Sequence, residues 1–167
     1  MPILVSDTSV IIDLERGQLL EPMFALPFEF AVPDLLFERE LAGPLGEALI
    51  ALGLRVEELQ PAEVTRAIEV IQQRRALSVP DSFAYALAEQ RQWTLLTGDG
   101  ALRQVANQNG LEIHGVLWIC DRFEEYAAIT LQDLHAGLSL IGGHPRCRLP
   151  AGEITTRLQR YAETLEG

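Results

Sequence analysis

A short apolar run that leads to an aspartate occurs twice in this chain, and it constrains the fold more than any other feature. Ile3–Ser6 leads to Asp7, and Trp93–Gly98 leads to Asp99. Apolar runs of this length that stop at polar residues are typical of strands buried in a parallel sheet. The carboxyl ends of such strands meet at one edge, where open α/β sheets keep their chemistry. We therefore expect Asp7 and Asp99 to lie together.

The rest of the sequence alternates between strand-like runs and apolar residues at helical spacing. Further strands are predicted at 28–32, 54–59 and 111–114, helices at 10–20, 33–42, 45–52, from 61, from 79, around 102–106, at 116–126, from 131 and from 154, and an extended stretch at 144–150. This order predicts a three-layer α/β/α sandwich around a five-stranded, mainly parallel sheet. With 167 residues, 48% of them hydrophobic, one domain with a sizeable core is expected.

Charge and composition exclude several classes of function. The net charge is −11, so any polyanionic substrate must be held locally by arginines or by a metal ion. All 13 basic residues are arginines, and the absence of lysine excludes Walker-type phosphate loops and Schiff-base chemistry. Cys120 and Cys147 show neither metal-ligand nor disulfide spacing, which is typical of free thiols in a reducing cytoplasm. Without a signal segment or a membrane-spanning run, we expect a soluble, cytoplasmic protein with no membrane partner.

Other carboxylates accompany the two strand-end aspartates. Glu38 and Glu40 follow the second strand, and Asp81 lies in the first turn of a helix that leads toward the fourth strand. Carboxylates held together repel one another and raise each other's pKa unless a cation intervenes. With no cysteine or histidine beside them, these acids suit Mg²⁺ or Mn²⁺ better than Zn²⁺. Such ions activate water and neutralise phosphate charge, so phosphodiester hydrolysis is the chemistry that this set predicts.

Each of these residues also has a purely structural interpretation. Asp7 and Asp99 are suited to cap the helices that follow them, and Asp81 to complete a capping box with Ser78. Two glutamates on a helix are most often solvated, and Glu38 and Glu40 point in different directions, so at most one of them joins the site.

Hydroxyl and basic residues near the aspartates are secondary candidates. Thr8, Ser9 and Thr97 are placed to hydrogen-bond the carboxylates, with turn and cap roles as the alternative. Arg103 follows Asp99 by four residues and is a candidate phosphate contact, although exposed helical arginines are common. Arg146 and Arg148 are further candidates for touching RNA. The three histidines are dispersed and form no nucleophilic arrangement.

Three segments resemble the aspartate motifs of PIN-domain nucleases in order and separation. They are Val5–Ser9, Ser78–Ala84 and Leu95–Arg103, and Ile113–Ile119 resembles the family's last strand and following helix. The resemblance covers residues 1–141 and leaves 142–167 as a carboxyl-terminal extension with a helix. It implies an Mg²⁺- or Mn²⁺-dependent endoribonuclease that acts on RNA. Such proteins are often the toxin of a toxin–antitoxin pair, with a cognate antitoxin as partner. A second copy of the chain, in a homodimer, is a further candidate partner. Asp7, Asp81 and Asp99 would be the metal ligands.

The fourth acidic position departs from the family's spacing. In PIN domains a glutamate followed by leucine commonly stands at the place, counted from Pro33, that Arg39 occupies here. Glu40 with Leu41 restores the Glu-Leu dipeptide if the alignment is shifted by one residue. Glu38 is the nearest glutamate if no gap is allowed. The residues leave this choice open.

Other enzymes with aspartates at a sheet edge fit less well. Haloacid-dehalogenase-like phosphatases need a second aspartate where this chain has Ser9, and response-regulator receivers need a lysine. The alternative from another class is a catalytically silent PIN-like domain that binds a protein or an RNA. Loss of metal-dependent cleavage with retained binding would identify it.

Overall fold

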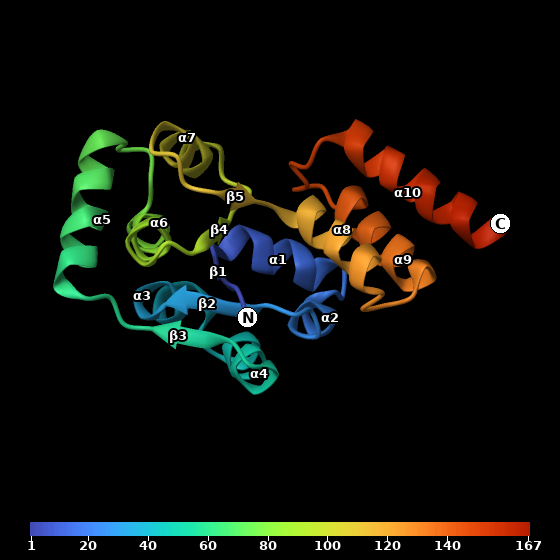
Figure 1. Cartoon of the computed structure of the whole chain (residues 1–167), viewed down its shortest axis with the longest axis horizontal. Helices are drawn as coiled ribbons and strands as arrows, with labels where there is room; N and C mark the ends of the chain where they lie inside the picture. The colour runs from blue at the N-terminus through green and yellow to red at the C-terminus, as the bar shows by residue number, and fades with distance from the viewer.

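The structure, a computed structural model, describes residues 1–167, and its centre is a single five-stranded sheet (Figure 1). The strands are β1 (Ile3–Ser6), β2 (Glu29–Pro33), β3 (Arg55–Glu57), β4 (Thr94–Leu96) and β5 (Ile113–His114). Their order in the sheet is β3-β2-β1-β4-β5, and every neighbouring pair is parallel. The predicted five-stranded, mainly parallel sheet is thereby confirmed, although β3 and β5 are shorter than the apolar runs that predicted them.

Helices cover both faces of the sheet. They are α1 (Thr8–Arg16), α2 (Leu20–Phe24), α3 (Asp34–Leu36), the π-helical turn η1 (Phe37–Leu41), α4 (Pro44–Leu52), α5 (Pro61–Gln73), α6 (Val79–Arg91), α7 (Gly100–Gln108), α8 (Val116–Tyr126), α9 (Leu131–Gly143) and α10 (Ala151–Glu166). Figure 1 shows α5 and α6 on one side of β1 and β4, and α1, α8 and α9 on the other. The predicted three-layer α/β/α architecture is therefore confirmed.

The order of connections creates a crevice between β1 and β4. From β1 the chain passes through α1 and α2 to β2 on one side, whereas β4 lies on the other side and leads through α7 to β5. Val5 is paired with Ala31 of β2 and with Leu95 of β4, and all three side chains are buried. Ligands in open α/β sheets bind at such a switch point, outside the carboxyl ends of the strands. Asp7 and Asp99 follow the two strands that flank it.

The helix predicted at 10–20 ends at Arg16, and the next helix, α2, begins only at Leu20. It breaks after Arg16 because Gly17 packs backbone to backbone against Gly137 of α9, so a Cβ on Gly17 would stand 2.8 Å from the Gly137 carbonyl oxygen. Gln18 then takes a left-handed conformation, with φ of 57°, before α2 begins. The apolar spacing of 10–20 does not reveal this close approach, because it comes from a helix far along the chain.

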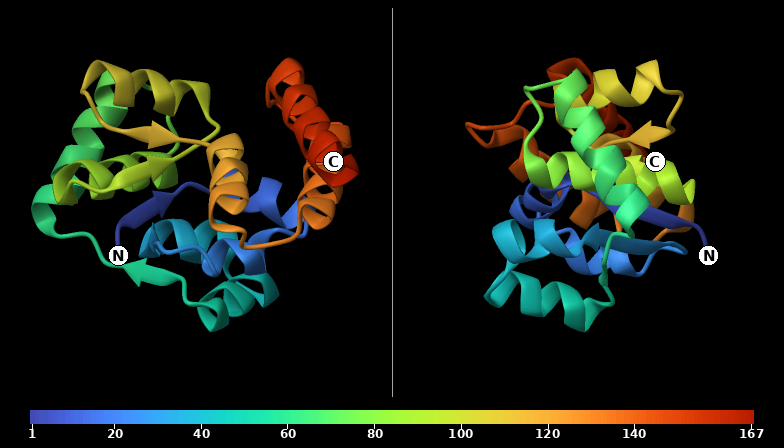
Figure 2. Two further views of the ribbon diagram at one scale, coloured as in Figure 1. Left: turned by 45° about the vertical axis from the view of Figure 1, so that its right-hand side comes forward. Right: turned by 90° about the vertical axis from the view of Figure 1, so that its left-hand side faces the viewer.

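The carboxyl-terminal segment packs on the same body as the rest of the chain. Ile154 and Tyr161 of α10 are buried, and Arg157 of α10 donates to Asp121 of α8 at 2.9 Å. Figure 2 shows α10 lying on the outer side of the helical layer formed by α8 and α9. The boundary at residue 141 stays a prediction. None of the helices has the length and apolar character that crossing a membrane requires.

The stretch at 144–150, predicted to be extended, contains a turn. The backbone N–H of Cys147 donates to the His144 carbonyl at 3.0 Å, and the N–H of Arg146 donates to His144 Nδ1 at 3.1 Å. The prediction was wrong because His144 supplies acceptors for the backbone that follows it, and Pro145 favours a turn. The turn directs this segment back toward α1 and α7.

Candidate active site

Asp7 is the most buried carboxylate of the chain. It is 1% exposed at the end of β1, and it caps α1 by accepting the Val10 N–H at 3.1 Å. The Ser9 hydroxyl donates to the same carboxylate at 2.8 Å, and the Thr97 hydroxyl donates to it at 2.5 Å. Burial raises the pKa of Asp7 above its usual value, and the negative charge of Asp99 adds to the rise against the effect of these hydrogen bonds. Asp7 is thus held in one position, and its hydrogen bonds partly offset the cost of burying its charge.

The same two hydroxyls join Asp7 to the loop after β4. Thr97 Oγ1 accepts the backbone N–H of Asp99 at 3.0 Å, and Ser9 Oγ accepts the N–H of Gly98 at 3.1 Å. Asp99 in turn caps α7, with Oδ2 accepting the Leu102 N–H at 3.0 Å. The capping roles expected for Asp7 and Asp99 are therefore both present, and the two aspartates lie just after the carboxyl ends of the neighbouring strands β1 and β4.

Asp81 lies in the first turn of α6, beside the other two aspartates. Its backbone N–H donates to the Ser78 hydroxyl at 3.2 Å, which is the predicted cap of α6. Burial raises the pKa of Asp81 to about 6, and the charges of Asp7, Asp99 and Glu40 contribute to this rise. Asp81 is therefore within electrostatic reach of the other three carboxylates.

Glu40, and not Glu38, belongs to this group of carboxylates. The Thr8 hydroxyl, adjacent to Asp7 in the chain, donates to Glu40 Oε1 at 3.1 Å. Glu40 is part of η1, where the i→i+5 bonds of a π-helix fit one residue more than a regular turn holds. The extra residue brings Glu40 to the place that an α-helix would give to Arg39. Glu38 and Glu40 are both exposed, but Glu38 accepts no hydrogen bond from Thr8 or from another residue of the site.

The chemistry of these donors fits a hard divalent cation. All four are carboxylates, no cysteine or histidine accompanies them, and their repulsion would be relieved by Mg²⁺ or Mn²⁺. Their placement is less converged than a finished metal centre, since no three acidic, histidine or cysteine side chains come together closely enough to coordinate one ion.

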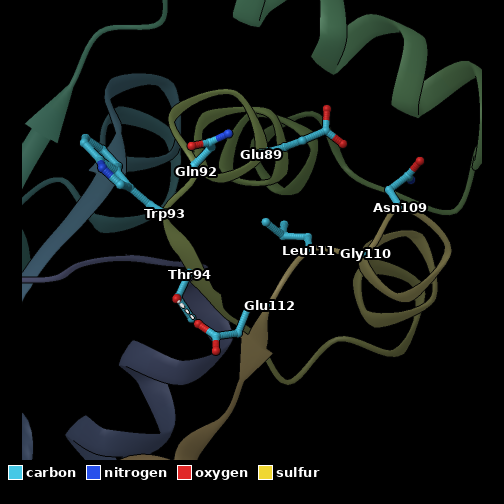
Figure 3. A pocket seen from close by; sticks show the side chains of 8 residues that line it. All are labelled: Glu89, Gln92, Trp93, Thr94, Asn109, Gly110, Leu111 and Glu112. Atoms are coloured by element: carbon cyan, nitrogen blue, oxygen red, sulfur yellow. Dashed lines mark hydrogen bonds between the residues drawn. The ribbon is translucent and has the colours of Figure 1, made fainter.

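A cavity lies at the opposite end of the strands from the acidic site, and it has no comparable group of unpaired carboxylates. It measures about 290 Å³ and lies where β4 and β5 begin. Figure 3 shows Glu89 and Glu112 among its lining side chains, with Glu112 accepting from the Thr94 hydroxyl. Glu89 is paired with Arg66 at 2.6 Å. Both carboxylates are thus neutralised or hydrogen-bonded, and the cavity offers no catalytic arrangement.

The fold and the acidic site define a nuclease-like α/β domain. A family model described as a PIN domain matches residues 3–163, so the chain belongs to the PIN-domain family. PIN domains are generally nucleases that use divalent metal ions. No curated protein matches the sequence significantly. The match extends beyond residue 141 and takes in most of α10, which the motifs alone did not reach.

Proposed function

We propose that this protein is a divalent-metal-dependent endoribonuclease. The observation that carries the proposal is the placement of Asp7 and Asp99 after the two strands that flank the switch point of the sheet, joined through Thr97, with the Glu40 carboxylate bonded to Thr8 beside Asp7. Burial, and after it the charges of Asp7, Asp99 and Glu40, raise the pKa of Asp81 to about 6. Carboxylates this close repel one another, and a divalent cation would relieve that repulsion and also offset the negative charge of a phosphodiester brought beside them. That the protein is a toxin with a cognate antitoxin stays a prediction from the family resemblance. That it forms a homodimer is also still a prediction.

The residues of the site divide the work according to their surroundings. Asp7 is buried and oriented by three donors, which makes it the fixed reference for an ion. Asp99 uses one oxygen to cap α7 and keeps Oδ1 free of protein hydrogen bonds, and Asp81 stands opposite with its raised pKa. When bound, Mg²⁺ or Mn²⁺ supplies Lewis-acid activation of water and neutralises phosphate charge. Glu40, at the exposed rim, is placed to orient water through its carboxylate.

One observation favours the alternative of a catalytically silent binding domain. Asp7 and Asp99 are already satisfied as helix caps, and no three side chains come together as finished metal ligands. A domain that kept these aspartates only for capping would have the same fold and no activity. The two functions predict different behaviour toward metal ions, so they can be separated directly.

The test is cleavage of a panel of labelled RNAs by the full chain with Mn²⁺ or Mg²⁺. Asp99→Asn is the matched control, because asparagine caps a helix as well as aspartate and removes only the charge. We expect cleavage that EDTA abolishes and that Asp99→Asn lacks, with an unchanged melting temperature. Full activity of both Asp99→Asn and Asp7→Asn would refute the site. No cleavage of any RNA, together with no metal binding by calorimetry, would favour the silent domain.

A further inference from the structure

A cleft of about 480 Å³ opens directly beside the acidic site. Its floor is the loop Gly98–Gly100, which carries Asp99 between two residues without side chains. A Cβ on Gly100 would meet nothing within 4 Å, so this backbone is open to a ligand. Its walls come from α1, from the start of α7 and from the turn at 144–150.

Four arginines line this arginine cleft, and they come from three separate parts of the chain. Arg16 lies at the end of α1, Arg103 on α7, and Arg146 and Arg148 in the 144–150 turn. Asp13 is the one carboxylate in the cleft besides Asp99, and it is paired with Arg16 at 3.5 Å. The cleft is therefore a basic region in a chain whose net charge is −11.

Seven of the 13 arginines of this chain are paired with carboxylates, whereas three of the four in the cleft are not. Ion pairs with carboxylates engage Arg16, Arg55, Arg66, Arg91, Arg122, Arg157 and Arg160. No carboxylate pairs with Arg39, Arg74, Arg75, Arg103, Arg146 or Arg148. Half of these unpaired arginines converge on one cleft although 24 acidic residues are present to pair with them. Like charges held together without partners indicate an anionic ligand.

Local contacts hold this cluster in place. Arg103 Nη2 donates to the Thr97 carbonyl at 3.4 Å and lies against Gly115, where a Cβ would stand 3.0 Å from it. The hydrogen bonds from Arg146 and Cys147 to His144 shape the turn, and Leu149 packs against the core. Arg103 is therefore bonded to Thr97, the residue that also orients Asp7, and the turn supplies the other two unpaired arginines of the same cavity.

We propose that the arginine cleft binds the sugar–phosphate backbone of the RNA strand that enters the acidic site. Guanidinium groups recognise phosphate through paired N–H donors, and phosphate contacts position a strand without reading its sequence. The identity of the ligand as RNA rests on the proposed function. The cleft explains how a strongly acidic protein holds a polyanion: three unpaired arginines offset the local field next to Asp99.

The test is binding of a labelled single-stranded RNA to the full chain in EDTA, where cleavage is absent. Arg146→Gln/Arg148→Gln is compared with Arg55→Gln/Arg160→Gln, which removes the same charge elsewhere. Arg55 contacts Glu29 and Trp93 at the far edge of the sheet, and Arg160 pairs with Glu124 at 2.8 Å on the outer helices. Arg103→Gln provides a second cleft variant, and melting temperatures check that each variant is folded.

We expect the cleft double variant to weaken binding about tenfold or more and to reduce the slope of log K against log salt by about 1.4, for two lost phosphate contacts. Arg103→Gln should reduce the slope by about 0.7, and the control pair should bind within about twofold of the parent. Equal affinities and slopes for the cleft and control pairs would overturn the proposal, even if the protein cleaves RNA. Cleft-dependent binding without any cleavage would instead leave the cleft standing and refute the nuclease.

Discussion

The hydroxyl of Thr97, after β4, donates a 2.5 Å hydrogen bond to the carboxylate of Asp7, after β1, across 90 positions of the sequence. Both side chains are buried, and the same hydroxyl accepts the Asp99 N–H at 3.0 Å. One threonine thus connects the two strand-end aspartates of the site. It positions both aspartates, and it is itself fully buried.

Replacing Thr97 by valine should destabilise the protein because it leaves a buried carboxylate short of a donor at nearly constant shape. We expect a loss of about 1–3 kcal/mol in the free energy of unfolding, measured by urea denaturation. The matched control is Thr94→Val at the start of the preceding strand β4, because the hydrogen bond of Thr94 to Glu112 is exposed. This variant should cost less than about 0.5 kcal/mol. Equal costs for the two variants would show that Thr97 does not support Asp7.

Glu40 and Glu38 should differ in their importance for cleavage. Glu40→Gln removes a charge that reaches Asp81 and weakens the contact with Thr8, so the initial rate of RNA cleavage should fall about 10- to 100-fold, as for groups that support metal ligands. Glu38→Gln changes an exposed side chain and should retain nearly full activity. A greater loss of activity from Glu38→Gln than from Glu40→Gln would show that Glu38, and not Glu40, is the fourth acidic residue of the site.

Deleting Arg39 should be tolerated, which is unusual for a deletion inside a helical segment. The π-helical turn η1 holds one residue more than a regular turn, so the deletion converts it into an α-helical turn and leaves Glu40 facing Thr8. We expect an unfolding free energy within about 1 kcal/mol of the parent and retained cleavage.

The control for this deletion is loss of Ala48 from the regular helix α4. There the missing residue rotates buried Leu49 out of the core, which should cost about 2–5 kcal/mol. If deletion of Arg39 costs as much as deletion of Ala48, the extra residue is not what the π-helical turn accommodates.

The raised pKa of Asp81 should make its charge destabilising at neutral pH. The pKa of the folded carboxyl is about 6, above its ordinary value of 3.8, so between these pH values the folded state binds more protons than the unfolded state. Stability contributed by this group is therefore full below pH 3.8 and is lost as the pH rises through 6.

Asp81→Asn should accordingly stabilise the metal-free protein at pH 7 and flatten this pH dependence. Because Asp81 is only partly buried, we expect a gain of about 1–2 kcal/mol, measured by urea denaturation in EDTA at pH 4 and pH 7. Mn²⁺ should raise the melting temperature of the parent more at pH 7 than at pH 5, since the ion competes with protons. A destabilised Asp81→Asn at pH 7 would contradict the repulsion on which the site is based.

Local patterns in the sequence predict several properties of this protein. Buried parallel strands need near-continuous apolar runs, so Ile3–Ser6 and Trp93–Gly98 were sufficient to predict the sheet and to place Asp7 and Asp99 at one edge. Ser78 predicted the start of α6, and with it the position of Asp81, because a cap depends on neighbours within one turn.

Other properties depend on contacts between distant segments, which local patterns do not contain. The choice of Glu40 over Glu38 follows from a π-helical turn, and the break at Gly17 follows from its contact with Gly137. The arginine cleft joins Arg16, Arg103 and the 144–150 turn, and Arg16 carries no sequence signal because an arginine at a helix end is ordinary. The site's fixed aspartates thus came from strand patterning, whereas its fourth acid and its basic wall were decided by packing.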